Sequence, residues 1–337
     1  MLFIPVVSKI GNTLMPCHSA RAKMLIRKGK AVKRFKRGIF YIQLTERKDG
    51  AVQEVACGID PGSKKEGFTV KSANHTFLNI QSNAKTGVGE KLEERRIMRR
   101  SRRNRNTPCR KNKQNRNINS KKIPAGTKAR WDIKLKIVKI LKSLFPISSF
   151  VVEDIKATTK KNQKRWNSSF SPLEVGKTWF YKEIEKLGNI TIKQGYETYQ
   201  ERNNLQLKKD KNKLSDKFEA HCVDSWVLAN MAVGGHIKPD NTSMLIISPI
   251  ELQRRQLHRL QAEVGGERKR YGSTNSLGFK RGGLVKHIKY GLCYVGGFIK
   301  NRISLHNLET GKRVCQNSKI SDCIKFGYNT WKLKYSY

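Results

Sequence analysis

Between residues 54 and 231 the chain contains apolar segments with the pattern of β-strands and others with the pattern of helices, and the order of these segments limits the fold that the chain can adopt. Three segments have the length and residue types of β-strands, namely 54–60, 67–71 and 76–80. After them, periodicity and end residues predict a helix at 127–147, a strand at 150–155, a helix at 171–187, a strand at 189–193 and a helix at about 216–231. A β-meander followed by alternating helices and strands predicts an α/β fold.

The regions on either side of this core differ from it in pattern. The first 50 residues predict a small basic β-rich module, with strands at 3–7 and 39–44 and a short helix around 19–28. The last hundred residues predict a small β-barrel of the SH3-like or OB-like kind. Its expected strands are 284–288, 292–298, 303–307, 313–316 and 323–328.

The composition changes sharply at residues 91–116, which are dominated by basic side chains. Seven arginines fall on every face of any helix drawn through this segment: Arg95, Arg96, Arg99, Arg100, Arg102, Arg103 and Arg105. A helix that is charged all round is solvent-bridging or bound along its length to a partner. The alternative is a disordered basic tail, although a position between two core segments argues against it. From Pro108 to Gly126 we expect order only on RNA.

The excess of positive charge indicates a polyanionic partner. The chain has 70 Lys and Arg against 26 Asp and Glu, for a formal net charge of +44. A short DNA site needs about 6–10 phosphate contacts, so the surplus predicts a large RNA or several strands. A membrane surface is the weaker candidate, because the charge does not concentrate on one amphipathic helix. Near the C-terminus the expected nucleic-acid contacts are Arg268, Lys269, Arg270, Lys280, Arg281 and Lys286.

Cysteine usage and hydropathy bear on the compartment. The seven cysteines form no CxxC pair, which argues against a zinc knuckle or a disulfide framework and favours a reducing cytosol. Residues 1–7 lack the basic start of a signal peptide, and no run approaches about 18 apolar residues. We therefore expect a cytoplasmic protein that does not enter a membrane.

Four residues predict a metal-dependent site. Asp60 and Glu153 each end an apolar strand, whereas His221 and Asp224 lie three apart on one helix and share a face. Carboxylates in this arrangement suit two Mg²⁺ ions, which Mn²⁺ can replace, and such a pair supports phosphodiester hydrolysis. Asp60 would bridge both ions, Glu153 and Asp224 would complete one shell each, and His221 would orient or deprotonate water.

Asp60 and His221 also have a structural interpretation, and the choice of Glu153 has an alternative. An Asp before Pro-Gly is often only a turn former, and a lone helix histidine is often only a packed, hydrogen-bonded side chain. Glu153 is followed by Asp154, so the acid that faces inward depends on strand parity.

Five short motifs carry a resemblance to a known family. Thr13-Leu14-Met15-Pro16-Cys17 resembles the PLMP motif of the transposon-encoded IscB/IsrB proteins, with Thr13 in place of the first Pro. Residues 99–103 match the RRxRR motif of their bridge helix. Residues 58–62, 151–155 and 221–224 resemble their RuvC-I, RuvC-II and RuvC-III motifs, in the family's order.

The spacing of these motifs narrows the resemblance. IscB proteins carry an HNH nuclease domain between RuvC-II and RuvC-III, but no histidine lies between Glu153 and His221 in this chain. The chain therefore resembles the HNH-lacking IsrB family. That resemblance implies a prokaryotic, nucleoid-associated nickase that acts as one protein copy with an ωRNA guide, and double-stranded DNA carrying a flanking motif as its target.

The resemblance also implies a domain plan. The expected fold is an RNase H-like (RuvC) core split by an arginine-rich bridge helix. The expected parts are a PLMP domain at 1–52, RuvC-I at 53–88, the bridge helix and a basic linker at 89–126, RuvC-II and RuvC-III at 127–240, and a C-terminal β domain at 241–337 that contacts RNA and the target flank.

Two other functions are compatible with these residues. A guide-independent RuvC-type nuclease such as a junction resolvase would show the same acids, but it needs neither the arginine helix nor the C-terminal barrel. A non-catalytic RNA-binding protein with a vestigial core is disfavoured by the intact acids.

Overall fold

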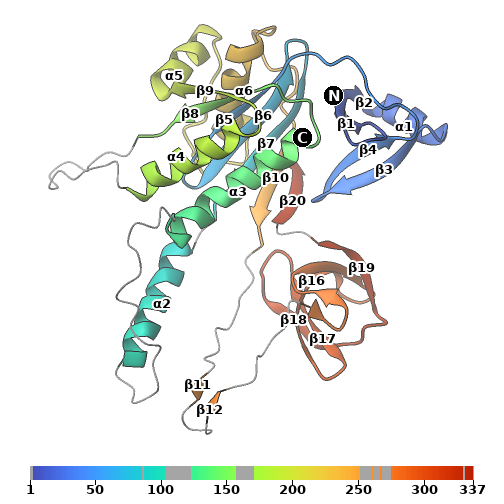
Figure 1. Cartoon of the computed structure of the whole chain (residues 1–337), viewed down its shortest axis with the longest axis vertical. Coiled ribbons are helices and arrows are strands. Elements are labelled where there is room, and N and C mark those ends of the chain that lie inside the picture. The colour runs from blue at the N-terminus through green and yellow to red at the C-terminus, as the bar shows by residue number, and fades with distance from the viewer. Residues whose placement is uncertain are drawn as a thin grey trace, which may run out of the picture. The chain divides into compact units, whose positions relative to one another are not determined.

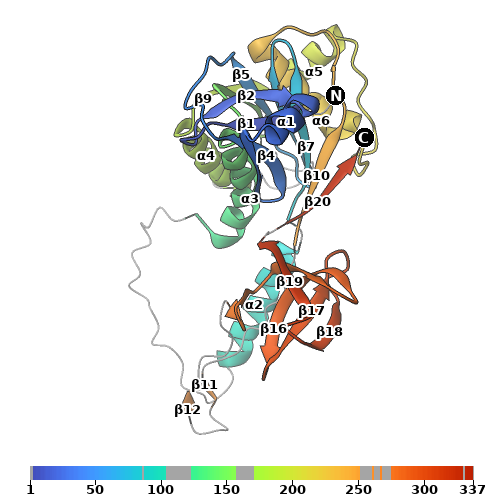
Figure 2. The same cartoon turned by 90° about the vertical axis from the view of Figure 1, so that its right-hand side faces the viewer.

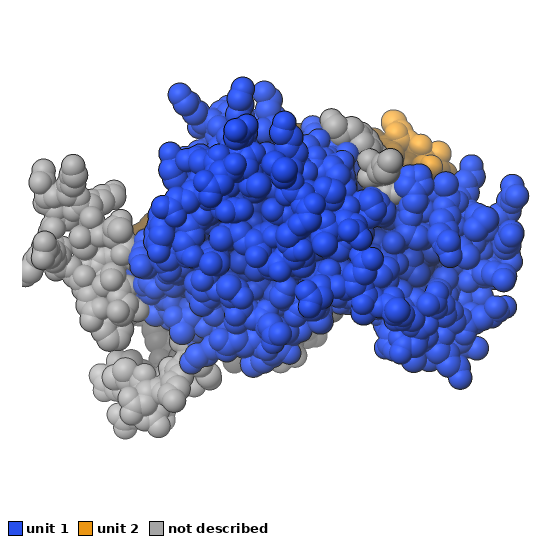
Figure 3. Space-filling view, turned by 90° about the horizontal axis from the view of Figure 1, so that it is seen from above, with its two compact units in different colours: residues 1–88, 122–248, 333–337 blue, residues 89–121, 249–332 orange. Residues whose placement is uncertain are grey.

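The computed structural model describes residues 3–85, 87–103, 123–156, 171–250, 260–261, 266–267, 275–328 and 331–336. The chain divides into two compact units, coloured separately in Figure 3. Unit 1 consists of residues 1–88, 122–248 and 333–337, and unit 2 of residues 89–121 and 249–332. None of the helices in the described residues is long and apolar enough to cross a membrane.

A seven-stranded sheet forms the centre of unit 1 (Figure 1), with the order β20-β10-β7-β6-β5-β8-β9. Strands β5 (Val55–Asp60), β6 (Lys65–Ser72) and β7 (Thr76–Asn83) form the predicted antiparallel meander. Strand β8 (Ser149–Asp154) pairs in parallel with β5, and β9 (Asn189–Gln194) pairs in parallel with β8. The chain is thus a mixed α/β protein, as the order of its segments predicted.

Helices lie on both faces of the sheet, as strand parity shows. In β6, Glu66 forms an ion pair with Lys134 of α3 (Ala125–Lys142), whereas Lys71 donates to Asn230 of α6 (Phe218–Val233) at 2.6 Å. Because successive strand residues point to opposite faces, even-numbered positions of β6 face α3 and odd-numbered positions face α6. The predicted end of α6 is confirmed at Gly234, which has a φ of 63°.

Helix α4 (Pro172–Glu185) begins as its sequence predicts. The Ser171 hydroxyl accepts a hydrogen bond from the backbone N–H of Glu174 at 3.0 Å, and Pro172 occupies the first helical position. Trp131 of α3 packs on Phe180 of α4 with 5.2 Å between ring centroids. The two helices therefore form a packed pair.

Outside the N-terminal module, three elements of unit 1 were not predicted. Helix α5 (Gly195–Asn204) follows β9, and strands β10 (Met244–Pro249) and β20 (Trp331–Ser336) extend the central sheet. The expected domain boundary placed residues 241–337 in a C-terminal domain, but β10 pairs in parallel with β7. Residues Met244–Ile247 are buried, so this apolar run belongs to the core.

The N-terminal module of unit 1 is a four-stranded sheet with one helix. Its elements are β1 (Phe3–Val7), β2 (Thr13–His18), α1 (Ser19–Arg27), β3 (Ala31–Lys36) and β4 (Ile39–Leu44), with the sheet order β2-β1-β4-β3. The expected β1, α1 and β4 are confirmed. The two missed strands are both edges, where Pro16 in β2 and basic side chains in β3 are tolerated and weaken the sequence pattern.

Unit 2 contains the arginine-rich helix and the C-terminal sheet (Figure 2). Helix α2 (Val88–Arg103) is exposed on nearly all of its surface from Gly89 to Ser101. All five expected strands are confirmed, in an antiparallel sheet of order β18-β17-β16-β15-β19. They are β15 (Gly283–His287), β16 (Gly291–Ile299), β17 (Arg302–Asn307), β18 (Arg313–Ser318) and β19 (Cys323–Tyr328).

Two short hairpins also belong to the described part of unit 2. They are β11 (Leu260–Gln261) with β12 (Gly266–Glu267), and β13 (Asn275–Ser276) with β14 (Phe279–Lys280). The sheet buries a small core that includes Val285, Val295 and Leu305. In the described ladders β18 and β19 are the edge strands, so the expected barrel is represented by a five-stranded sheet.

Helix α6 lies directly on β5 and β6 because two glycines leave room for its backbone. A Cβ atom on Gly58 would lie 1.9 Å from the carbonyl oxygen of Ser225, and one on Gly67 would lie 2.3 Å from that of His221. No side chain fits into these positions. The distance between α6 and the sheet is therefore set by backbone-to-backbone contact.

This contact leads to a stability prediction. Replacing Gly58 by Ala should lower the free energy of unfolding by about 3 kcal/mol, because the new methyl must displace helix backbone from a packed core. Gly327→Ala is the matched control, since Gly327 also lies in a strand and its Cβ would meet nothing within 4 Å. Denaturant unfolding of both variants tests the prediction, and equal midpoints would contradict it.

Candidate active site

Asp60 and Glu153 lie on one face of the sheet, at the ends of two neighbouring strands. Gly58 faces α6, so Asp60, two residues further along β5, faces the same side. Gly58 is paired with Val151 across the parallel ladder, which places Glu153 on this side as well. The last described pair of the ladder is Ile59 with Val152, so Asp60 and Glu153 follow at equivalent positions.

Asp224 of α6 completes a cluster of three acids. Burial raises the pKa of Asp60 well above its ordinary value, and the charges of Glu153 and Asp224 raise it further. Burial and the charge of Asp224 also raise the pKa of Glu153. Such mutual effects require short separations in a weakly solvated place. The three predicted acids are therefore brought together by the fold.

Helix α5 supplies the surroundings of Glu153. A Cβ on Gly195, the first residue of α5, would lie 3.0 Å from the Oε1 atom of Glu153. A hydrogen bond from the Thr198 side chain lowers the pKa of Glu153 and partly offsets the effect of burial. The start of α5 thus packs against one of the candidate catalytic carboxylates.

Two cations hold Asp224. Its side chain is only 2% exposed, and its Oδ1 atom accepts from Arg202 Nη1 of α5 at 2.5 Å. Lys209 donates to the other oxygen, Oδ2. A buried carboxylate without such partners would be strongly unfavourable, so these two residues compensate its charge. The Arg202 guanidinium also lies over the ring of Tyr199, at 5.3 Å from the centroid.

His221 lies one helical turn before Asp224, and its ring is anchored. Its Nε2 atom donates to the carbonyl oxygen of Lys213 at 2.9 Å, which leaves Nδ1 as the acceptor of the neutral ring. Burial lowers the pKa of His221, and the nearby Lys209 and Lys65 lower it further, whereas the carbonyl of Lys213 and the charge of Asp224 raise it. The net lowering favours the neutral form that a proton acceptor requires.

Asp154 points to the opposite face, which settles the parity question left by the sequence. It forms an ion pair with Lys177 of α4 at 2.7 Å and accepts from the Tyr181 hydroxyl at 3.2 Å. These contacts lower the pKa of Asp154 despite its partial burial. Glu153 is therefore the acid of this pair that faces Asp60.

The residue types of this cluster fit a divalent cation. No group of three or more His, Cys, Asp or Glu side chains within the described residues is positioned to hold a metal ion. Both oxygens of Asp224 are taken by Arg202 and Lys209. Even so, three crowded carboxylates that raise one another's pKa form the hard-oxygen, negatively charged donor set that Mg²⁺ prefers.

The predicted nucleic-acid residues are placed only in part. Arg95, Arg96, Arg99 and Arg100 are exposed on α2, and Arg102 and Arg103 belong to its last turn. In the C-terminal part, Lys280 and Lys286 are exposed and Arg281 is half-buried. Arg105, Arg268, Lys269 and Arg270 lie outside the described residues. Their roles remain predictions.

Sequence reasoning missed Arg202, Lys209 and the whole of α5. A pattern that could have revealed the helix is Gln194 followed three residues later by Glu197. In the structure Glu197 accepts from the backbone N–H of Gln194 at 2.7 Å, as in a capping box. No sequence pattern could have revealed the contact between Arg202 and Asp224, because these residues belong to separate helices.

The fold and the acid cluster together define a mixed α/β protein with an acidic site on one face of its central sheet. Residues 4–170 match the model of the family described as RRXRR protein. This match spans β1 to β8 and contains α2, Asp60 and Glu153, whereas His221 and Asp224 lie beyond it.

Among solved structures, the chain is similar to T. thermophilus RuvC in complex with a Holliday junction substrate. The two share 12% identity with a TM-score of 0.31, over 54% of this chain and 98% of that chain. A further Thermus thermophilus RuvC structure has 14% identity and a TM-score of 0.28, over 53% of this chain and 97% of that chain. No curated protein matches the chain.

The opposite pKa shifts of two aspartates predict opposite effects on stability. The folded-state pKa of Asp60 is raised, so ionisation of Asp60 destabilises the fold as pH rises through that pKa. In a metal chelator at pH 7, Asp60→Asn should raise the melting temperature by a few degrees, the shift that about 1 kcal/mol produces in a domain of this size. Near pH 4 the gain should shrink.

Asp154→Asn is the control for this prediction. The folded-state pKa of Asp154 is lowered, so its ionised form stabilises the fold above the ordinary pKa and this stabilisation is lost as pH falls. Asp154→Asn should therefore lower the melting temperature at pH 7 and have little effect in acid. Thermal unfolding from pH 4 to pH 8 measures both variants, and shifts of the same sign at pH 7 would refute the assignment of the two faces.

Proposed function

We propose that this protein is a divalent-metal-dependent DNA endonuclease, guided by an RNA, that nicks the non-target strand in the manner of the HNH-lacking IsrB family. The observation that carries this proposal is that Asp60 and Glu153, on the sheet face covered by α6, lie near Asp224 of that helix. These acids come from three separate segments of the chain. Carboxyl groups that raise the pKa of their neighbours in this way cluster at functional sites.

Acids of this kind favour phosphodiester hydrolysis over other chemistry. When Mg²⁺ or Mn²⁺ is bound it supplies charge for the scissile phosphate and an activated water. Asp60, Glu153 and Asp224 would hold the cations, with Asp60 shared between them. The neutral His221 ring, fixed through Nε2 by Lys213, would orient or accept a proton from water. Arg202 would keep Asp224 in place, since it contacts only one of the two oxygens.

The charge distribution supports a nucleic acid as a resident partner. The net charge of +44 exceeds what a single DNA duplex site would neutralise. Arg95, Arg96, Arg99 and Arg100 of α2 are exposed, and the described part of this helix buries little apolar surface, as expected of a helix that gains its partner on assembly. The match of residues 4–170 to the RRXRR family includes this helix. A structured ωRNA fits these properties.

The acidic site found among the described residues, together with the lack of any histidine between Glu153 and His221 in the sequence, limits the expected product. The guide would pair with the target strand, which leaves the displaced strand single and able to enter the acidic site. The basic C-terminal part, including Lys280, Arg281 and Lys286, would contact the guide and the duplex that flanks the target. We expect one protein copy per ribonucleoprotein, in the cytoplasm of a prokaryote.

Cleavage of a plasmid whose two strands are labelled separately tests this function. Protein, guide RNA and Mg²⁺ should yield nicked circles cut on the non-target strand. Asp60→Ala, Glu153→Ala and Asp224→Ala should each lower the nicking rate by roughly three orders of magnitude, because each removes a metal ligand. His221→Ala should cost about 10²–10⁴-fold if the ring acts as a base, and less if it only orients water.

Asp154→Ala serves as the matched control, because it removes a neighbouring carboxylate that faces α4. It should retain nicking at a temperature where it stays folded. Nicking that needs no RNA would instead indicate a guide-independent nuclease. Loss of guide and target binding in Asp60→Ala, or linear product from protein and guide alone, would contradict the proposal.

The arginine helix provides a second test, directed at the guide. Reversing Arg99, Arg100, Arg102 and Arg103 to Glu should abolish guided nicking and weaken guide binding by several orders of magnitude, since phosphate contacts dominate such affinity. The control reverses four exposed basic residues of the N-terminal module, namely Arg27, Lys28, Lys33 and Lys36. Filter binding at fixed salt compares the two variants. Equal guide affinities would exclude a special role for α2.

A further inference from the structure

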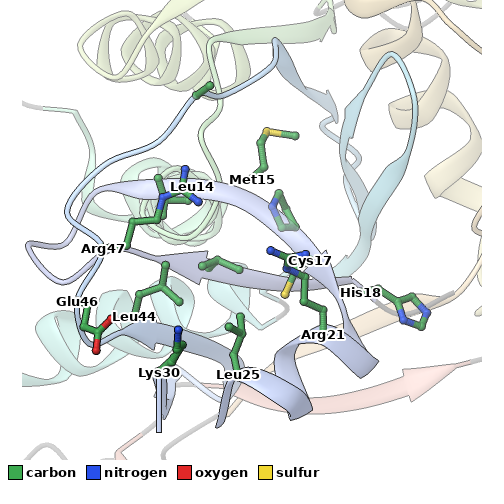
Figure 4. Close-up of a pocket in the computed structure, with 13 residues that line it drawn as sticks. Leu14, Met15, Cys17, His18, Arg21, Leu25, Lys30, Leu44, Glu46 and Arg47 are labelled. Carbon is green, nitrogen blue, oxygen red and sulfur yellow. The ribbon is translucent and has the colours of Figure 1, made fainter. Parts of the chain in front are cut away.

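The Thr13–Cys17 motif, which the nuclease function does not use, forms one wall of a pocket in the N-terminal module. Four consecutive residues of this motif line the pocket, namely Leu14, Met15, Pro16 and Cys17. Figure 4 shows Leu14, Met15 and Cys17 around the hollow. In a regular strand, successive side chains point to opposite faces. Four neighbours on a single cavity therefore require a break in the strand.

A β-bulge in β2 provides this break. Val6 of β1 is paired with Leu14 and Ile4 with Cys17, so Met15 and Pro16 together stand opposite the single residue Pro5. A bulge re-aims side chains and is often found beside binding sites. Pro16 fits this position because β2 is an edge strand and a bulged residue needs no ladder N–H.

The pocket has an apolar floor and a cationic rim. Its cavity measures about 520 Å³, and its floor is formed by Leu14 of β2, Leu25 of α1 and Leu44 of β4. Three exposed cations stand around it, namely Arg21, Lys30 and Arg47, with Glu46 as the one acidic side chain among the lining residues. Figure 4 shows these residues arriving from different elements around one hollow.

We propose that this pocket binds one unstacked nucleotide of the guide RNA. An apolar floor suits the faces of a base or sugar, and cations at the mouth suit the phosphates on either side. The Glu46 carboxylate can accept a hydrogen bond from the amino group of a base. A volume of this size lies within the range of small-ligand sites. The RNA as the source of the nucleotide rests on the proposed function, whereas the pocket itself does not.

Cys17 offers a direct measure of occupancy. It lines the pocket and is half-buried, and Cys315 in unit 2 is likewise half-buried and serves as an internal control. Burial raises the pKa of Cys17, so the full-length protein, freed of nucleic acid, is alkylated with iodoacetamide at about pH 9 to provide thiolate. Mass spectrometry then gives the rate at each cysteine with and without adenosine 5′-monophosphate, adenosine or inorganic phosphate.

We expect the monophosphate to slow alkylation of Cys17 by about tenfold at saturation and to leave Cys315 unchanged, because the occupant covers only the first thiol. Protection by inorganic phosphate alone, to the same extent, would overturn the proposal, since it would show an anion on the rim and nothing on the floor. Absence of protection by the monophosphate would also overturn it.

Paired variants on α1 separate pocket effects from general charge and size. Arg21→Glu should weaken nucleotide binding by about tenfold or more, whereas Arg27→Glu, on the same helix but outside the pocket, should not. Leu25→Trp should fill the floor and abolish protection, whereas Met24→Trp should retain it. Because Arg21 also influences Cys17 electrostatically, each variant is judged by its ratio of rates with and without nucleotide.

Measurements on the assembled complex show whether the bound nucleotide belongs to the guide RNA or to the target DNA. Guide RNA alone should protect Cys17 before any DNA is added, and Leu25→Trp should lose guide affinity while Met24→Trp keeps it. Protection that appears only after target DNA is added would overturn the assignment to the guide. The alkylation rate of Cys17 is measured without any DNA cleavage. The pocket proposal can therefore be refuted while the nuclease proposal stands, and the nuclease proposal can be refuted while the pocket proposal stands.

Discussion

The contact between the backbone of α6 and strands β5 and β6 determines the position of everything in the candidate site. Gly58 and Gly67 have no side chain to separate the layers, and Ser225 and His221 contribute their backbone carbonyls to the contact. A helix packed through side chains would stand further from the sheet. At the observed separation, Asp224 reaches the charges of Asp60 and Glu153. The two glycines thus allow the close approach of α6 that brings Asp224 near Asp60 and Glu153.

The second constraint is electrostatic, because the acids are crowded in a protein that is otherwise overwhelmingly basic. Arg202 and Lys209 bind Asp224, and Lys209 also moderates the pKa of Asp60 and Glu153. These cations belong to α5 and the segment after it. Only folding brings this part of the chain close to the acids of β5 and β8. A metal ion would compete with Lys209 for one Asp224 oxygen, since the side chain of Lys209 is the more exposed of the two partners.

The sequence predicted most strands and helices of the core where one face of an element is uniformly apolar. It placed β5, β6, β7 and β8, the Ser171 cap of α4 and the Gly234 end of α6. It failed for α5, whose exposed Tyr196 and Tyr199 obscure the helical pattern. It also failed for β2 and β3, because edge strands have only one neighbour and need less apolar sequence. The apolar run at 244–247 was included in the C-terminal domain, although it pairs with β7 of the core, since hydropathy shows burial but not the partner strand.

The sequence by itself determined the residue types of the candidate site and their places at strand ends, because local pattern fixes where a strand or helix stops. The sequence did not show which of the two neighbouring acids, Glu153 or Asp154, faces Asp60. The tertiary structure decided this, because Glu153 faces Asp60 while Asp154 pairs with Lys177. Tertiary structure alone brought Arg202 to Asp224 and gathered Leu14, Leu25 and Leu44 around one pocket. Contacts between distant segments depend on packing distance and helix orientation, and neither is encoded in the spacing of residues along the chain.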